Sequence, residues 1–219
     1  MAPLLFSGGI LMDDPYRTIR SGAQASFTEK RSRFIGHAKP AETQEEAAEF
    51  VRKIREENRE AAHNVYAYLL REGLAQRYSD DGEPQGTAGI PVLDVLRKTG
   101  VTDCAVVVTR YFGGVLLGAG GLVRAYSHAV SLALDAAGIT EMAVCREASL
   151  RCSYGCYGRV APLVARFGGA VDGESFAAEV TLSFHIRCES AGAFRSAFAD
   201  ATCGSGQLTL AGKKYYPVP

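Results

Sequence analysis

The sequence lacks any run of 18 apolar residues, so no segment is long enough to cross a bilayer as an apolar helix. It also lacks net charge, because 24 Lys and Arg residues balance 24 Asp and Glu residues. The chain as a whole is therefore not built for strong nonspecific attraction to nucleic acid or to an anionic membrane, although a local basic patch is compatible with this balance. We expect no membrane partner and no sequence-specific role on DNA.

Cysteine is sparse and poorly spaced for metal binding. The six cysteines include no CxxC pair, and the closest two are Cys152 and Cys156. This spacing disfavours zinc and a disulfide framework, and it favours small buried thiols. The apolar stretch Pro3–Phe6 has no basic residue before it, which makes a poor secretory signal. We therefore expect a cytoplasmic protein in which residues 1–19 are a ragged leader.

The first part of the chain alternates strand-like and helix-like segments. Thr43 and Glu46 form a capping box that predicts the start of a helix, and Gly100 and Gly138 predict the ends of two later helices. The continuous apolar run at 104–109 is typical of a strand buried on both faces. In all, we expect strands at 27–37, 65–70, 104–109 and 139–145, helices at 43–54, 91–98 and 122–133, and a loop at 78–89.

A second unit begins near residue 146. Apolar and polar residues alternate strictly from Val180 to Cys188, which indicates a strand with one face exposed to water. The order of elements after residue 147 is β-α-β-β-α-β, the pattern of a ferredoxin-like domain. The sequence therefore predicts an α+β protein of two domains, residues 20–146 and 147–219, with no repeat that would indicate a solenoid.

Three carboxylates crowd the predicted loop. Asp80, Asp81 and Glu83 fall within four residues, and like charges this close repel unless a cation, an arginine or backbone N–H groups meet them. Oxygen ligands of this kind suit Mg²⁺. A solvated turn, in which the Asp side chains cap local backbone amides, explains the same pattern, so the sequence leaves a possible Mg²⁺ site open and names no firm metal ligand.

A glycine-rich segment joins the apolar strand to the following helix, with arginines on both sides. Such a segment can turn backbone N–H groups toward one anion at a helix N-terminus. It lacks the Gly-Lys-Ser/Thr step of a Walker A loop. Tight packing, with the first arginine pairing Asp80 or Asp81, is the competing explanation. The candidate residues are Gly113, Gly114, Gly120, Gly121, Arg110 and Arg124, with His63 added as a histidine at the start of a strand.

Two blocks carry a resemblance to a known family. Ser79–Gly89 and Val107–Ser127 resemble the characteristic motifs of the IMPACT/YigZ family, and Lys30–Gly36 and Ala62–Tyr68 fit its upstream blocks. The resemblance covers about residues 20 to 140. It implies an N-terminal βαβ domain with the fold shared by GHMP kinases and elongation factor G, and a ferredoxin-like C-terminal domain similar to the last domain of that factor. Eukaryotic members of the family regulate translation.

Three functions remain open at this point. The first is a non-enzymatic, translation-associated regulator that binds RNA, the ribosome or a translation factor through the candidate residues. The second is a Mg²⁺-dependent enzyme acting on phosphate or nucleotide, with Asp80, Asp81 and Glu83 around the metal. The third is a protein–protein docking module. No catalytic residue can be named, and no cofactor other than Mg²⁺ is expected.

Overall fold

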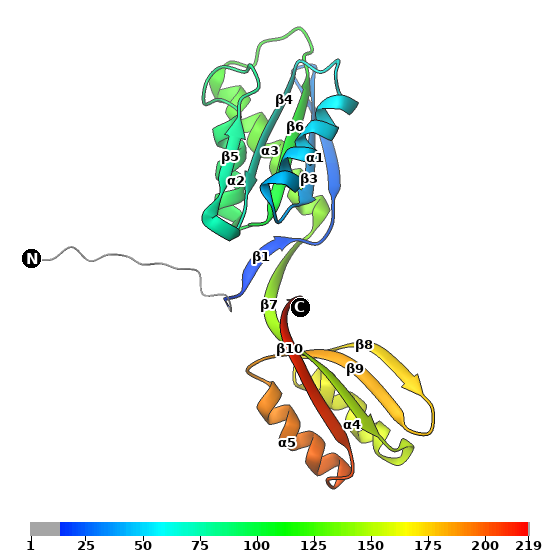
Figure 1. Ribbon diagram of the computed structural model, residues 1–219. Helices are drawn as coiled ribbons and strands as arrows, with labels where there is room; N and C mark the ends of the chain where they lie inside the picture. Colours follow the sequence, from blue (N-terminus) through cyan, green and yellow to red (C-terminus); the bar gives the residue numbers. More distant parts are fainter. Residues whose placement is uncertain (1–13, 219) are drawn as a thin grey trace, which may run out of the picture. The chain divides into compact units, whose positions relative to one another are not determined.

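The computed structural model describes residues 14–218, which form two compact units, Tyr16–Glu141 and Met142–Val218 (Figure 1). Residues 1–13 of the expected leader lie outside the described residues, but Tyr16–Ile19 forms strand β1. Ile19 belongs to the core of the first unit, and the Thr18 side chain is also buried. The last residues of the expected leader are therefore part of the folded N-terminal unit.

The N-terminal unit is a five-stranded antiparallel sheet covered by helices on both faces. The strand order is β2-β3-β6-β4-β5. Helix α1 packs on one face, and α2 and α3 pack together on the other (Figure 1). The bounds are β2 (Ala23–Glu29), β3 (Ser32–Pro40), α1 (Gln44–Glu57), β4 (His63–Leu69), β5 (Gln76–Ser79), α2 (Gly89–Thr99), β6 (Cys104–Tyr111) and α3 (Ala119–Ala137).

The central strand β6 joins two hydrophobic cores, as its sequence predicts. Val106 and Val108 pack into the core under α2 and α3, whereas Ala105 and Val107 pack into the core under α1. Alternate side chains of a strand point to opposite faces, so a strand buried on both faces must be apolar throughout. The polar residues at the end of this strand, Thr109 and Arg110, are therefore also buried.

The helix caps predicted for this unit are confirmed, and the three helices are longer than predicted. The Thr43 side chain accepts a hydrogen bond from the Glu46 backbone N–H, and the Glu46 carboxylate accepts one from the Glu42 backbone N–H. Gly100 ends α2 in the left-handed conformation with φ 69°, and Gly138 follows α3. Caps of this kind satisfy backbone groups that have no partner inside a helix.

The boundaries of three strands were predicted wrongly. The segment 27–37 is a hairpin of β2 and β3, because Lys30 and Arg31 both adopt positive φ in the turn. Such turns usually carry Asn or Gly, and that signal is missing here. The strand predicted at 139–145 and the first strand predicted after residue 147 form one continuous strand, β7 (Ile139–Cys152). The segment 76–79, partly assigned to a loop, is the edge strand β5.

The C-terminal unit has the ferredoxin-like order predicted for it. Its sheet runs β10-β7-β9-β8, and α4 and α5 cover one face. Val180, Leu182, Phe184 and Ile186 of β9 all face this core, which confirms the predicted alternation. The bounds are α4 (Tyr154–Arg166), β8 (Ala170–Phe176), β9 (Val180–Arg187), α5 (Ala191–Thr202) and β10 (Gln207–Val218). The α+β class and the two-domain architecture are thus confirmed.

Within residues 14–218, none of the helices combines the length and the hydropathy that crossing a membrane requires. Cys104, Cys145 and Cys152 are buried, whereas Cys203 is exposed. Burial raises the pKa of the Cys104 thiol to about 12. That thiol is therefore a neutral core side chain at neutral pH.

Candidate functional site

The first acidic residue of the loop holds the start of α2. One carboxylate oxygen of Asp80 accepts hydrogen bonds from the backbone N–H groups of Ala88 and Gly89, at 3.1 and 2.8 Å. The other oxygen accepts one from the Gly86 backbone N–H at 3.0 Å. A carboxylate at a helix N-terminus satisfies free amides and interacts favourably with the helix dipole. The geometry of Asp80 is that of a helix cap.

Glu83 and Arg110 form a buried ion pair. The Glu83 Oε1 atom lies 2.6 Å from the Arg110 Nη1 atom, and the two side chains are only 3% and 6% exposed. The Tyr126 hydroxyl donates to the same Oε1 atom at 2.7 Å. Burial first, and the Glu83 carboxylate second, raise the pKa of Tyr126. The phenol therefore stays protonated and remains a donor to Glu83.

Arg110 is held from several sides. Its guanidinium lies over the rings of Phe34 and Phe112, and Nη2 is 3.4 Å from the Ser32 hydroxyl. The Ser32 hydroxyl also accepts a hydrogen bond from the Gly113 backbone N–H. Arg110 thus ties the loop of Glu83 to the end of β6 and the start of β3.

Asp81 and His63 complete this network at its edge. Asp81 pairs with Arg55 of α1 and accepts a hydrogen bond from the Asn64 backbone N–H at 2.6 Å. His63 Nδ1 makes a 2.8 Å hydrogen bond with the Asp81 carbonyl oxygen, which requires a proton on Nδ1. His63 Nε2 is 3.8 Å from Glu83 Oε1. The acidic loop therefore contacts α1, β4 and β6 at once.

The three carboxylates thus have separate partners and do not converge on one point. Within residues 14–218 no group of three or more His, Cys, Asp and Glu residues is arranged to hold a metal ion. The arginine at the end of β6 pairs with Glu83, and the expectation that it pairs with Asp80 or Asp81 was wrong. This arrangement gives the magnesium interpretation no geometric support.

The predicted glycine loop is divided between a loop and a helix. Gly113 and Gly114 lie in the loop, whereas Gly120 and Gly121 lie in the first turn of α3. A Cβ on Gly113 would lie 2.0 Å from the Arg31 backbone, so the glycine is required for this close approach. The glycines therefore serve packing as well as turn geometry.

The two arginines that flank this segment do not share a site. Arg110 is buried against Glu83, whereas Arg124 is exposed and lines a cavity of about 230 Å³ together with Lys30 and His128. The loop between them exposes apolar side chains, with Leu116 82% exposed. The geometry does not place both guanidinium groups on a single anion.

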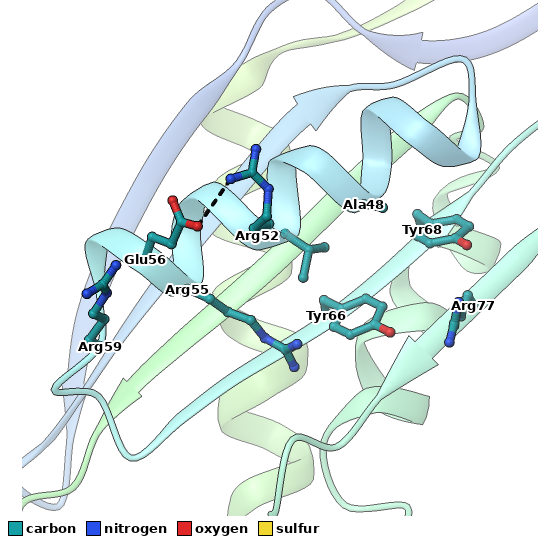
Figure 2. A pocket seen from close by; sticks show the side chains of 9 residues that line it. Ala48, Arg52, Arg55, Glu56, Arg59, Tyr66, Tyr68 and Arg77 are labelled. Carbon is teal, nitrogen blue, oxygen red and sulfur yellow. Dashed lines mark hydrogen bonds and ion pairs between the residues drawn. The ribbon is translucent and has the colours of Figure 1, made fainter.

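A larger cavity lies on the α1 face of the same unit, among residues that the sequence analysis did not select. It has a volume of about 370 Å³ and lies between α1 and strands β4 and β5 (Figure 2). We call it the arginine pocket. Its lining comprises Ala48, Val51, Arg52, Arg55, Glu56, Arg59, Tyr66, Tyr68 and Arg77.

Two arginines of the pocket have no acidic partner. Arg52 pairs with Glu56, and Arg55 pairs with Asp81. Within the part of the chain that the structure describes, the side chains of Arg59 and Arg77 make no hydrogen bond or ion pair, and both are exposed. The pocket therefore combines an apolar and aromatic floor with a rim of net positive charge.

Part of the signal for this pocket is present in the sequence. Arg52 lies in the helix predicted at 43–54, and Arg55, spaced i, i+3 from it, shares its face because α1 continues to Glu57. Arg59 follows the end of this helix. Arg77 comes from β5, an edge strand that the sequence analysis treated partly as a loop. Only the pairing of β5 with β4 places Arg77 opposite Tyr68 and beside that helix face.

Comparison with known families matches both units. The family described as Impact N-terminal domain matches residues 30–134. A family described as a domain of unknown function, DUF1949, matches residues 150–205. The first match contains the acidic loop, the buried Arg110 and the arginine pocket, and the second lies within the ferredoxin-like unit.

Individual relatives extend over most of the chain. A protein of Bacillus subtilis, "IMPACT family member YvyE", is 42% identical over 146 residues, which is 66% of this chain and 67% of the relative. "IMPACT family member YigZ" of Escherichia coli is 35% identical over 182 residues, 82% of this chain and 89% of the relative. A solved structure of a hypothetical protein aligns with a TM-score of 0.58 at 33% identity, covering 92% of this chain and 98% of the other.

Proposed function

Because the chain belongs to the IMPACT family, we propose that it is a non-enzymatic, translation-associated regulator that binds RNA through the arginine pocket. The observation that carries this proposal is the set of four arginines around one cavity, two of them without an acidic partner. Guanidinium groups match phosphate geometry and are the side chains most often used for phosphate contacts.

The charge of this pocket is local, which reconciles RNA binding with a neutral chain. The net charge of the protein is zero, so long-range attraction does not drive association. Arg59 and Arg77 each contribute a charge that the surrounding protein leaves uncompensated. Contacts of this number give binding with a shallow dependence on salt, because the slope grows with the number of phosphates neutralised.

Fluorescence anisotropy with a short unstructured RNA, titrated at low and at physiological salt, tests the proposal. We expect binding that weakens with salt, with a slope of log Kd against log salt reduced by about 0.7 for each phosphate contact that is removed. Arg59→Ala and Arg77→Ala are each expected to weaken binding and to lower this slope. Both side chains are exposed, so neither change is expected to disturb the fold.

Arg195→Ala is the matched control, since Arg195 is an exposed arginine on α5 of the other unit and its loss changes the net charge equally. It should leave the affinity and the salt slope unchanged. Absence of RNA binding at low salt would overturn the proposal. Equal loss of affinity in all three variants would show that total charge, rather than this pocket, governs binding.

A further inference from the structure

We infer that the arginine pocket takes one nucleotide of single-stranded RNA, with its base against the Arg55–Tyr66 pair and its flanking phosphates at Arg59 and Arg77. This inference rests on the proposed function and specifies the ligand of that site. It assigns separate roles to the aromatic floor and to the charged rim, and the two roles can be measured separately.

The floor of the pocket provides a flat surface for a base. Tyr66 is half-buried, and the guanidinium of Arg55 lies 5.4 Å from the centre of its ring. The Arg55 charge is already paired with Asp81, so this guanidinium is held over the ring. An arginine plane and a tyrosine ring held in this way form a platform on which any base can stack, because every base has a π-face.

The rest of the floor is apolar and aromatic. Val51 and Tyr68 are buried beside Tyr66 in the core under α1. Ala48 adds a short apolar side chain to the lining of the same pocket. An apolar floor of this kind favours a planar, weakly hydrated group over a free phosphate or a carboxylate.

The dimensions of the pocket select a single strand. Its volume of about 370 Å³ is at the lower end of the range for small-ligand sites. It can enclose one nucleotide but not the stacked pairs of a duplex. Sequence-tolerant recognition of RNA by stacking requires an unpaired base, because the bases of an A-form duplex are covered by their neighbours.

The free arginines lie on two sides of the platform. Figure 2 shows Arg59 in the turn after α1 and Arg77 on β5, with Tyr66 between them in this view. A nucleotide within a strand carries a phosphate on each side of its sugar, so a strand that crosses the pocket presents one phosphate to each arginine. Arg52 is less available, because it already pairs with Glu56.

A fluorescent reporter of stacking is available because the chain contains no tryptophan. Tyr66→Trp places the only indole of the protein in the pocket. Tyr154→Trp, the control, places it at an exposed position at the start of α4 in the other unit. We expect short single-stranded RNA to quench the fluorescence of the Tyr66→Trp protein at saturation and to leave the Tyr154→Trp protein unchanged. Equal response of both proteins, or no response of either at RNA concentrations that saturate the anisotropy signal, would overturn the inference.

Substitutions at the platform separate stacking from charge. Tyr66→Leu keeps an apolar side chain but removes the ring, and it is expected to weaken binding of single-stranded RNA by about tenfold. The salt slope should stay as in the wild type, since no charge is lost. Tyr66→Phe keeps the ring and should bind as the wild type does. Circular dichroism and thermal melting establish that each variant is folded.

Two competitors define the class of the ligand. The same RNA annealed to its complement is expected to compete at least about tenfold less well than the single strand, and poly-L-glutamate, which presents charge without bases, is expected to compete poorly. Equal competition by the duplex or by poly-L-glutamate would overturn the inference. RNA binding that depends on Arg59 and Arg77 but not on the Tyr66 ring would refute the stacking role and leave the proposed function intact.

Discussion

The buried pair of Glu83 and Arg110 makes a quantitative prediction about stability. Arg110→Met removes the guanidinium and keeps a long apolar side chain in its place. The Glu83 carboxylate, 3% exposed, then retains the Tyr126 hydroxyl as a donor at 2.7 Å and loses its charged partner. A charge left in this state typically costs about 3–5 kcal/mol.

The expected cost is large enough to measure directly. With a urea dependence of about 2 kcal/mol per molar, a loss of about 4 kcal/mol lowers the unfolding midpoint of the N-terminal unit by about 2 M. The pair connects three segments far apart in the chain, since Arg110 is on β6, Glu83 in the acidic loop and Tyr126 on α3. Loss of the pair should therefore loosen β6 and α3 together.

Hydrogen exchange read by mass spectrometry follows each unit of the full chain separately. Peptides from β6 and α3 are expected to lose protection in Arg110→Met, while peptides from α5 of the other unit serve as the internal reference. The double variant Glu83→Leu/Arg110→Met contains no unpaired charge, so it is expected to recover at least half of the lost stability. A double variant no more stable than Arg110→Met would refute the argument that the uncompensated carboxylate causes the loss.

Three further predictions follow from single contacts. Gly113→Ala should lower the melting temperature of the N-terminal unit, because its Cβ would lie 2.0 Å from the Arg31 backbone, whereas Gly120→Ala, inside α3 with 3.6 Å to its nearest neighbour, should raise stability by about 0.5–1 kcal/mol. Burial lowers the pKa of His37, so the unfolded chain binds a proton at this side chain at higher pH than the folded chain does. The stability of the N-terminal unit should therefore fall as the pH drops through 6.5. Urea titrations at several pH values measure this dependence, and His37→Gln should reduce it. Asp80→Ala should cost about 2 kcal/mol and speed amide exchange at the start of α2, with a smaller effect for Asp80→Asn.

Local sequence patterns were sufficient to predict the long helices and the strands with a regular pattern of buried residues. Thr43 caps α1 through its own side chain, so the boundary depends only on neighbouring residues. The valines of β6 face two hydrophobic cores, and the uninterrupted apolar run in the sequence predicts such a strand. In these elements the local preference and the tertiary environment agree.

Strands β8 and β5 carry little signal of their own and depend on the neighbouring strand with which each pairs. Strand β8 is exposed along its whole length and pairs with β9, so it carries no burial pattern that a sequence can reveal. Strand β5 is an edge strand of four residues that pairs only with β4. Such segments become strands because a neighbouring strand offers free backbone groups, whatever their own residues prefer.

The candidate site was likewise predicted only in part, because some of its contacts depend on tertiary structure. A contact between Arg110 and the acidic loop was predicted only as a competing explanation, with Asp80 or Asp81 as the partner. The structure instead pairs Arg110 with Glu83. A buried charge needs a partner of opposite sign. The choice of Glu83 over Asp81 depends on the turn, where Asp81 adopts a φ of 47° and directs its carboxylate to Arg55. Turn geometry of this kind is not encoded in the spacing of the carboxylates.

The acidic loop and Arg110 stabilise the N-terminal unit, whereas the surface proposed for RNA binding is formed by other residues. Asp80 caps the start of α2, and Glu83 and Arg110 pair with each other, so their charges are not available to a ligand. Arg59 and Arg77 belong to no motif that we identified, yet their charges are uncompensated and exposed. Asp81 connects the two regions, because its contact with Arg55 fixes one side of the platform at Tyr66. A change at Asp81 is therefore expected to weaken RNA binding without any contact between Asp81 and RNA, and Asp81→Asn in the anisotropy titration is the measurement that tests this connection.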